Sequence, residues 1–393
     1  MREAVIVASV RTPGARAKRG SLKDTRADTI GATAIKGALD KVPQLKPDMI
    51  DDVIMGCSFP EAEQGLNIAR VLVKYLGLPD SVPGLTINRF CSSGLQAIAL
   101  AAQNIMVGWS DIVVAGGVES MSRVPMGGFI NRPDPDWTDE YPDVYVSMGI
   151  TAENVAKRYG ITREMQDELG VMSNERAAKA QDNGWFKDEI VPIEKAVKYI
   201  PKNGGYEKTY FVFDADDGVR RGTTMEGLAK LRPAFALNGT VTAGNSSQMT
   251  DGAAATILMA KEKAEELGIK PIAKFHNFQV VGVRPDEMGV GPRYAIPKLM
   301  EKTRMKLEDI DLFEINEAFA SQAIYCVREL GLSWDKVNIC GGAIALGHPL
   351  GCTGAKLTAT LINQLKRTGG KWGVVSMCIG GGMGAAGLIE LLD

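Results

Sequence analysis

Histidine is the scarcest versatile side chain in this sequence, with only two among 393 residues. Two imidazoles cannot build a histidine-rich metal centre, so metal chemistry of that kind is not expected. The six cysteines show no CxxC spacing, which argues against a zinc ribbon or a thioredoxin-like redox motif. Their number is also far below the density of a disulfide scaffold. These features favour a reducing, cytoplasmic location.

An excess of charge is missing too, because 45 Lys and Arg stand against 47 Asp and Glu. This balance predicts neither a nucleic-acid partner nor binding to an anionic membrane. Long hydrophobic runs are also absent. The first run, Ala4 to Val10, has seven residues and predicts a buried strand rather than a signal sequence. The uncharged stretches 90–110 and 372–389 hold too many polar residues and glycines for a membrane span.

The two ends of the chain repeat each other weakly. A helical pattern and the strand MIDDVIMG, which ends at Gly56, match a later helical pattern and a strand that ends at Asn316. Two strand–turn–helix segments follow, and the glycines that open their helices are Gly94 and Gly354. Each half then ends in a closing strand, DIVVAGGVES or WGVVSMCIGGG. The sequence separation between these two strands is almost the same as that between the two glycines. A nearly constant offset predicts two similar halves.

Strands and helices alternate within each half, which predicts mostly parallel sheets covered by helices. Between the halves, prolines such as Pro133 and Pro135 mark an irregular excursion, and helical runs follow it. We therefore predict an α/β fold whose two similar layered halves are related by a pseudo-twofold. The expected units are an N-terminal half (1–120), an inserted loop lobe (121–250) and a C-terminal half (251–393).

Cys91 lies between a buried strand and a helix that opens at Ser92 and Ser93. The positive end of the helix dipole is expected to lower the pKa of a thiol there and to favour the thiolate. Gly94 would let backbone or substrate approach closely. A small buried apolar cysteine is the alternative interpretation of the same segment.

His348 lies in the loop GGAIALGHPLGCTGA, a few residues before the counterpart of Cys91 in the repeat. The pseudo-twofold could therefore bring the two side chains together, as a Cys–His pair requires. A core histidine with satisfied hydrogen bonds is the alternative. The other histidine, His276, is flanked by aromatic residues in a strand-like run and is interpreted as structural.

Two more candidates follow apolar strands, where open α/β sheets place their ligands. Cys378 precedes a glycine run that starts at Gly380, whose backbone N–H is free to approach a developing oxyanion. A buried inert thiol is the alternative for Cys378. Asn316 ends a strand and opens a helix, either as an N-cap or as the holder of a catalytic water. The GxGxxG pattern at 382–387 is not a dinucleotide site, because only six residues follow it.

Taken together, these segments resemble the thiolase family. Its motifs occur in family order over nearly the whole chain: NRFCSSGLQA, MGITAENVA, TMEGLAKLRPAF, TAGNSSQ, FEINEAFASQA, GGAIALGHPLGCTGA and GVVSMCIGGGMGAA. The resemblance is greatest to degradative 3-ketoacyl-CoA thiolases of the bacterial and peroxisomal type. It implies two similar α/β halves with a loop lobe, assembled as a homodimer or homotetramer.

The resemblance also implies roles for the candidate residues. Cys91 is the acylated nucleophile, His348 its base and Cys378 a second acid and base. Asn316 holds a water that binds one oxyanion, and the N–H of Gly380 helps to bind the other. The implied reaction is thiolytic cleavage of 3-ketoacyl-CoA by CoA, as in fatty-acid β-oxidation.

Acyl-CoA and CoA are the implied small-molecule partners, with other β-oxidation enzymes as protein partners. CoA enters as a substrate, so no cofactor or metal is expected. The residues implied in contacts with substrate or CoA are Arg220, Ser247, Met148 and Phe319.

The main alternative is an acetoacetyl-CoA thiolase that condenses two acetyl-CoA. That branch typically has a histidine where this chain has Ser147, and commonly a serine where this chain has Gly227. Both departures favour the degradative branch. A decarboxylating ketosynthase is disfavoured by Cys378 in the third catalytic position. A catalytically silent lipid- or CoA-binding module is disfavoured because all four candidate catalytic side chains are chemically competent.

Overall fold

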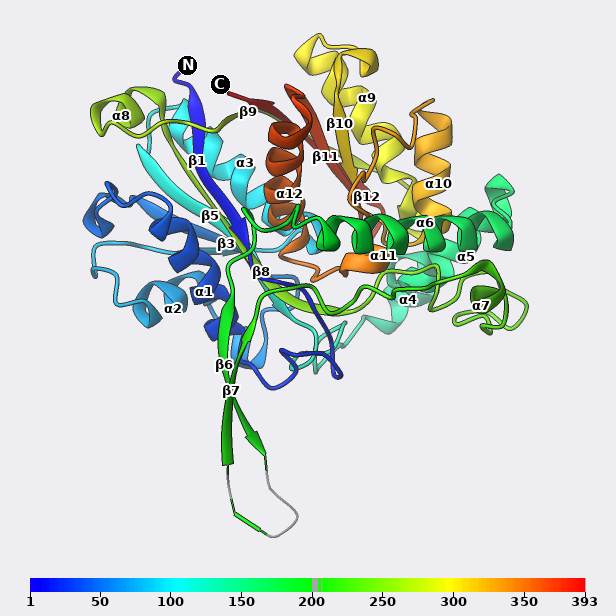
Figure 1. The fold of residues 1–393 in the computed structure, drawn as a ribbon. Coiled ribbons are helices and arrows are strands. Elements are labelled where there is room, and N and C mark those ends of the chain that lie inside the picture. Colours follow the sequence, from blue (N-terminus) through cyan, green and yellow to red (C-terminus); the bar gives the residue numbers. More distant parts are fainter. Residues whose placement is uncertain (200–203, 206, 393) are drawn as a thin grey trace.

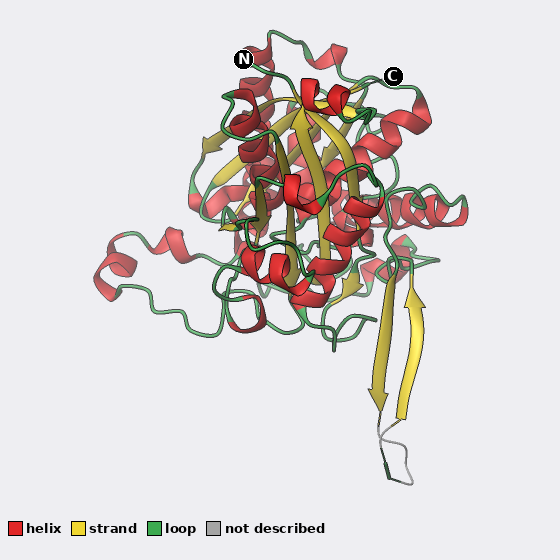
Figure 2. Cartoon of the chain, turned by 90° about the vertical axis from the view of Figure 1, so that its left-hand side faces the viewer, coloured by secondary structure: helices red, strands yellow, loops and turns green. Residues whose placement is uncertain are grey.

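The computed structural model describes residues 1–199, 204–205 and 207–392 (Figure 1). Its main feature is a ten-stranded mixed sheet in the order β10-β11-β12-β9-β1-β8-β5-β3-β4, with β2 paired to β8. A separate hairpin of two strands projects away from the sheet (Figures 1 and 2). The strands are β1 (Ala4–Arg11), β2 (Ala15–Arg16), β3 (Asp52–Gly56), β4 (Leu85–Ile87), β5 (Ile112–Ser120), β6 (Ile193–Tyr199), β7 (Glu207–Phe213), β8 (Thr250–Ala260), β9 (Ala273–Gly282), β10 (Leu312–Ile315), β11 (Trp372–Ile379) and β12 (Met383–Leu391).

Helices lie on both outer faces of the sheet and between its two halves. On one outer side α1 packs on β1, β5 and β8, and on the other α9 packs on β9, β11 and β12. Between the halves, α3 and α12 contact each other and strands of both. The helices are α1 (Ala27–Asp40), α2 (Ile68–Tyr75), α3 (Ser93–Met106), α4 (Pro135–Glu140), α5 (Met148–Tyr159), α6 (Arg163–Asp182), α7 (Met225–Ala229), α8 (Lys261–Glu266), α9 (Gly291–Thr303), α10 (Ala320–Glu329), α11 (Ala343–Leu346) and α12 (Thr353–Thr368).

Strand register confirms the internal repeat. β3 pairs in parallel with β5 through Asp52 and Val113, and β10 pairs in parallel with β11 through Leu312 and Gly373. The second pair follows the first at the same offset that separates the two helix-opening glycines. The sheet continues antiparallel from β5 to β8 to β1, and equally from β11 to β12 to β9. β1 and β9 then pair with each other and join the halves. The predicted pair of similar α/β halves is therefore present.

Two details differ from the sequence prediction. The sheet is not mostly parallel, because β12 follows β11 through a short turn and must run antiparallel to it. The second half also begins later than residue 251. Strand β8, at 250–260, lies between β1 and β5 of the first half. Its partner β5 ends at Ser120, and the whole segment expected as an inserted lobe lies between the two strands in sequence. The order of the chain therefore gave no sign that β5 and β8 pair.

The segment expected as an inserted lobe packs its helices α5 and α6 against the second half, whereas Ile193 and Phe213 join the core under α1. It carries α4 to α7 and the β6–β7 hairpin, none of which joins the main sheet in the described residues. Helix α5 packs on α10 and on the 3₁₀ helix η5 (Pro285–Val290), and α6 packs on α10 and α11. The lobe therefore brings the start of α5 toward the carboxyl ends of β10 and β11.

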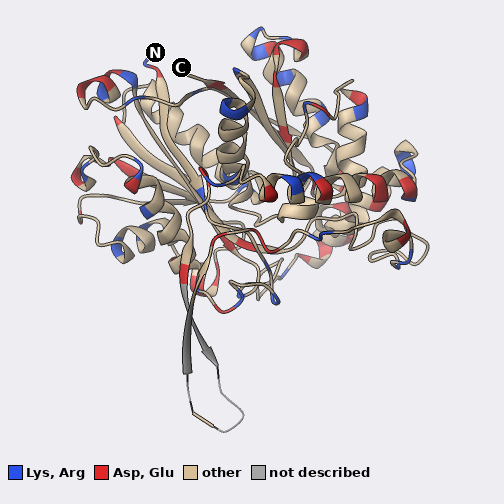
Figure 3. Cartoon of the chain, in the orientation of Figure 1, with Lys and Arg blue, Asp and Glu red and all other residues tan. Residues whose placement is uncertain are grey.

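Apolar side chains alternate between the layers along each strand. On β1, Val5 and Val7 belong to the core under α1, whereas Ala4 and Ile6 belong to the core around α3 and α12. Charges of both signs are interspersed over the helices (Figure 3). Within the described part of the chain, no helix is long and apolar enough to cross a membrane.

Candidate active site

The two central helices, α3 and α12, cross at a pair of glycines. A Cβ on Gly94 would lie 2.8 Å from the backbone nitrogen of Ala355, and one on Gly354 would lie 2.3 Å from that of Leu95. Only glycine permits such an approach of two helix backbones. The close approach predicted at Gly94 is therefore to α12. The crossing sets the starts of the two helices side by side.

Cys91 lies in the 3₁₀ turn η3 (Phe90–Ser92) directly before α3 and is only 7% exposed. Burial raises the pKa of its thiol to about 11, although hydrogen bonds from the backbone N–H groups of Gly380 and Cys91 act to lower it. The expected lowering of this pKa is therefore wrong, because loss of solvent outweighs the favourable helix start. The thiol carries its proton at neutral pH and needs a base before it can attack.

Cys378 lies near the end of β11 and is fully buried. Burial raises the pKa of its thiol well above the ordinary range, and the neighbouring Cys91 and Cys326 add to the rise. The electrostatic interaction of Cys378 with Cys91, together with the hydrogen bond from the N–H of Gly380 to the Cys91 sulfur, places these three residues in one group. Two protonated thiols thus share one buried site.

Apolar side chains surround the second thiol. Met148, the first residue of α5, packs in one cluster with Cys378 and Phe319. A Cβ on Gly380 would lie 3.3 Å from the sulfur of Met148 and 3.9 Å from the ring of Phe90. The absence of a side chain at Gly380 keeps this side of the thiol pair open. Both Met148 and Phe319, predicted to contact substrate, lie beside Cys378.

His348 lies in the loop between α11 and α12 and is 4% exposed. Its Nδ1 is 2.6 Å from Oγ1 of Thr353, a hydroxyl that donates its proton to the carbonyl of Pro349 at 3.0 Å. This pattern assigns a proton to Nδ1 and leaves the lone pair on Nε2. Burial, with a contribution from the charge of Lys356, lowers the pKa of His348 to about 3. The imidazole is therefore neutral and can act as a base through Nε2.

Asn316 follows β10 and is joined to β11 by a 2.9 Å hydrogen bond from its N–H to the carbonyl of Ser376. Its side-chain Nδ2 lies 3.3 Å from Nε2 of His348. Helix α10 begins at Ala320 with Phe319 as the preceding residue, so the N-cap interpretation of Asn316 is wrong. The buried Oδ1 of Asn316 has no hydrogen-bond partner among the described residues. An unpaired buried amide oxygen costs stability, which favours a functional explanation.

The predicted CoA contacts lie farther out. The backbone N–H of Ser247 bonds to the carbonyl of Ala318 at 2.9 Å, next to the cluster around Cys378. Arg220 donates to the carbonyl of Ala243 at 3.0 Å and is partly buried. Burial lowers its pKa, and Arg16 adds to this effect. Among the described residues Arg220 has no carboxylate partner, so its charge is available to an anionic group.

Sequence reasoning missed three polar residues that support this site, Thr353, Lys356 and Glu119. All three are buried. Glu119 accepts hydrogen bonds of 2.8 Å from the N–H groups of Ser58 and Gly351, and so ties β5 to the loop after His348. For Glu119 the available signal was a charged residue within an apolar strand, because charges are rarely buried without a partner or a task.

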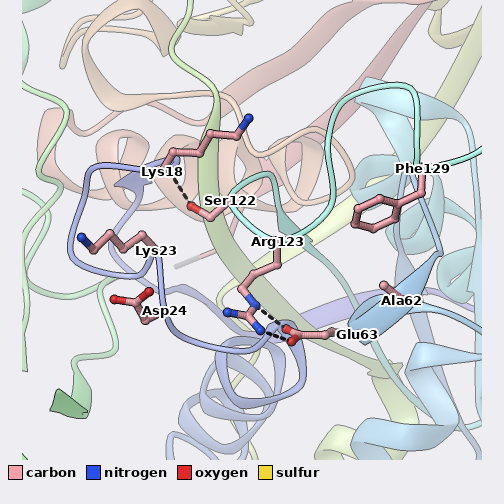
Figure 4. Close-up of a pocket in the computed structure, with 8 residues that line it drawn as sticks. All are labelled: Lys18, Lys23, Asp24, Ala62, Glu63, Ser122, Arg123 and Phe129. Carbon is pink, nitrogen blue, oxygen red and sulfur yellow. Dashed lines mark hydrogen bonds and ion pairs between the residues drawn. The ribbon is translucent and has the colours of Figure 1, made fainter. Parts of the chain in front are cut away.

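The cavity drawn in Figure 4 is separate from the thiols. Its volume is about 620 Å³, and Arg123 forms an ion pair with Glu63 in its wall. None of the predicted site residues lines it; the lining is Lys18, Lys23, Asp24, Ala62, Glu63, Ser122, Arg123 and Phe129. Across the described residues, no group of three or more His, Cys, Asp and Glu side chains could hold a metal ion.

Two family models together match most of the chain. Residues 4–262 match "Thiolase, N-terminal domain" and residues 269–391 match "Thiolase, C-terminal domain". The chain is 55% identical over 391 residues to the 3-ketoacyl-CoA thiolase of Bacillus subtilis (strain 168), with 100% of both chains covered.

Two solved structures share the fold. The acetyl-CoA acetyltransferase of Bacillus anthracis superposes with a TM-score of 0.89 at 42% identity, covering 100% of this chain and 99% of that one. The dimeric peroxisomal thiolase of Saccharomyces cerevisiae gives 0.87 at 40% identity, covering 100% and 98%. The chain belongs to the thiolase family.

Proposed function

We propose that this thiolase cleaves 3-ketoacyl-CoA with CoA, giving acetyl-CoA and an acyl-CoA two carbons shorter, as in fatty-acid β-oxidation. The protein is thus an acyltransferase. The observation that carries the proposal is the buried pair of protonated thiols, Cys91 and Cys378, beside the N–H of Gly380. The relative from Bacillus subtilis, which bears the name 3-ketoacyl-CoA thiolase, supports the same reaction.

The first step joins Cys91 to the substrate. Its sulfur attacks the 3-keto carbon while Nε2 of His348 takes the thiol proton. A pKa of about 11 on the thiol and about 3 on the imidazole keeps the proton on sulfur at rest. The proton therefore moves only as the sulfur–carbon bond forms, which is general-base catalysis of the attack.

Carbon–carbon cleavage follows and requires an acid. The bond between C2 and C3 breaks, its electron pair remains on C2 of the departing acetyl-CoA, and Cys378 gives that carbon a proton. The high pKa of Cys378 suits it to this role, because the thiol is protonated at neutral pH. Cys378 then takes the proton of incoming CoA. The CoA thiolate accepts the acyl group from Cys91, whose sulfur regains its proton from His348. This double displacement is ping-pong.

Each tetrahedral intermediate needs donors for its oxyanion. We assign one oxyanion to the backbone N–H groups of Cys91 and Gly380, and their hydrogen bonds to the thiol sulfur support this assignment. We assign the other to His348 and a water held by Asn316. The unpartnered Oδ1 of Asn316 supports that assignment, since a buried amide oxygen accepts a water readily.

Arg220, Ser247, Met148 and Phe319 are proposed to bind CoA and the acyl group. The partly buried charge of Arg220 suits a phosphate, and the thioether and ring of the last two suit apolar parts of the substrate. CoA is a substrate in this scheme, and no other cofactor takes part.

The assembly is proposed to be a homodimer or homotetramer, supported by the similar yeast thiolase described as dimeric. Other β-oxidation enzymes are the proposed protein partners. Six free cysteines, all buried and none bridged, are consistent with a reducing cytoplasm.

Synthesis of acetoacetyl-CoA from two acetyl-CoA is the less favoured alternative. The acetyl-CoA acetyltransferase structure is 42% identical to this chain, against 55% for the 3-ketoacyl-CoA thiolase of Bacillus subtilis. Thiolysis rates should be measured with 3-ketoacyl-CoA substrates of increasing chain length. We expect turnover of substrates well beyond four carbons. Activity confined to the four-carbon substrate would overturn the degradative assignment.

A further inference from the structure

Lys356 is a buried cation directly beneath the loop that carries His348. It is the fourth residue of α12 and only 4% exposed. Its Nζ donates to the carbonyl of Leu346 at 2.6 Å and to that of Gly347 at 3.0 Å. Burying an ammonium group costs free energy unless it gains specific partners. The partners chosen here are the two carbonyls immediately before His348.

The peptide between Gly347 and His348 is held at both ends. Lys356 donates to the carbonyl oxygen of Gly347. The N–H of His348 donates to the carbonyl of Gln248 at 3.0 Å and lies 3.1 Å from Oγ1 of Thr250. Gly347 has a φ of +80°, and a Cβ there would lie 2.1 Å from Oγ1 of Thr250. The backbone directly before the imidazole is therefore fixed in a conformation that strongly favours glycine.

A buried ionic network surrounds this lysine. Arg11 binds Asp216 through two hydrogen bonds, of 2.8 and 2.9 Å, and Glu189 through one of 2.6 Å. Burial lowers the pKa of Lys356 to about 8, with Asp216 acting to raise it. The titratable groups that act on Lys356 come from β1, β10, the residue before α12 and the segment between the halves; they are Arg11, Glu314, Cys352, Asp216 and Glu189.

We propose that Lys356 is a positioning residue for His348: its two hydrogen bonds fix the Gly347–His348 peptide and so the direction of Nε2 toward Asn316. Nε2 is then held unprotonated beside Asn316. The effect is indirect, because Lys356 donates to backbone carbonyls rather than to His348 or a thiol. This inference rests on the proposed function, in which His348 is the base. Lys356, which directly follows the motif GGAIALGHPLGCTGA, thereby supplies hydrogen bonds that hold the loop of His348.

The scarcity of histidine makes a direct test practical. With only His276 and His348 in the chain, ¹⁵N-histidine labelling gives two imidazoles, and a His276→Gln variant assigns them. Lys356→Met removes the charge and both hydrogen bonds, whereas Lys356→Arg keeps a cation with several donors. Lys298→Met is the matched control. Lys298 lies on the outer helix α9 and donates to one backbone carbonyl, that of Val280.

In the wild type, His348 is expected as the neutral Nδ1–H tautomer between about pH 6 and 8. In Lys356→Met its signals should move toward a mixture of the two neutral tautomers, because the loop that aims Nδ1 at Thr353 and Nε2 at Asn316 loses two hydrogen bonds. We expect kcat to fall about 10–100-fold with KM for CoA within about twofold. Lys356→Arg should restore the wild-type signals and most of kcat, and Lys298→Met should match the wild type. Should Lys356→Met fail to fold, Lys356→Leu, which is shorter and has neither a charge nor a donor, carries the same test.

An unchanged His348 spectrum in Lys356→Met would overturn the inference, whatever its activity. Equal losses of kcat in Lys356→Met and Lys298→Met would overturn it as well. Failure of the proposed function would look different, because the wild type itself would then show no thiolysis while the spectra still report on His348.

Discussion

The two halves of this thiolase share one backbone plan but differ in chemistry. At the start of α3 the first half has Cys91, whereas at the equivalent position before α12 the second half has Gly351. The N–H of Gly351 is bound by the carboxylate of Glu119 at 2.8 Å, and the N–H of Cys91 turns to its own thiol. Equivalent helix starts thus carry a structural tie in one half and, in the proposed mechanism, the nucleophile in the other.

The strand ends show the opposite bias. Asn316 and Cys378 in the second half correspond to Gly56 and Val118 in the first. A Cβ on Gly56 would lie 2.6 Å from the carbonyl carbon of Ser93, so no side chain fits there. In the proposed mechanism, one half therefore gives the nucleophile, and the other gives the base, the acid, the amide and the N–H of Gly380. The two halves share a frame, and their different side chains at equivalent positions make the proposed site.

Replacing the second thiol should have the largest effect. Cys378→Ala is expected to lower turnover about 10²–10⁴-fold, because the departing carbanion loses its proton donor, while acylation of Cys91 still occurs. The matched change in the first half, Val118→Ala, should cost about 2 kcal/mol of stability and leave kcat unchanged. Steady-state thiolysis and urea unfolding measure both. Normal turnover by Cys378→Ala would break the contrast between the halves.

At the equivalent positions 316 and 56, one alanine variant should lose activity and the other should lose stability. Asn316→Ala should lower kcat about 10²–10³-fold, since it removes the support of one oxyanion, and should leave stability unchanged or improved. Gly56→Ala should instead cost about 3 kcal/mol, because its Cβ meets the backbone of Ser93. Loss of stability in Asn316→Ala with normal kcat would make that residue structural.

The helix crossing should respond equally from both sides. Gly94→Ala and Gly354→Ala each place a methyl group against the other helix backbone, so each should lower the free energy of unfolding by about 2–3 kcal/mol. Urea unfolding at fixed protein concentration measures both. A large loss in only one variant would show that the crossing is not shared evenly.

A smaller difference between the halves is expected in the loss of stability at low pH, to which His348 contributes and its counterpart Asn88 does not. His348 has a folded pKa of about 3, below its ordinary value of ~6.5, so between these values the unfolded chain binds a proton that the folded chain does not. Stability therefore falls as pH drops. Between pH 7.5 and 5 this group should account for a loss of about 2 kcal/mol. His348→Asn, which installs the residue found at the counterpart Asn88, should reduce the acid-induced loss by that amount. An unchanged pH dependence of urea unfolding would contradict a neutral buried His348.

Much of this arrangement could be predicted from the sequence. The constant offset between Gly94 and Gly354 indicated two halves, and strand-end motifs indicated Cys91, Cys378 and Asn316. Such signals are local: a turn or a helix start needs particular residues close by in the sequence, so the sequence alone reveals it.

What depended on long-range packing could not be predicted. The pairing of β8 with β5 joins segments that lie on either side of the whole loop lobe, which no local pattern encodes. The pKa of Cys91 was predicted with the wrong sign, because helix position is local but burial comes from the whole fold. Lys356 escaped notice for a similar reason: a single lysine in a helix is usually solvated, and only tertiary structure shows it sealed beneath His348.

The central claim is that the nucleophile comes from the first half alone. Intact-mass spectrometry after mixing the protein with acetyl-CoA tests it most directly. We predict one acetyl group per chain in the wild type and in Cys378→Ala, and none in Cys91→Ala. An adduct that persists in Cys91→Ala, or its absence from the wild type, would contradict the account.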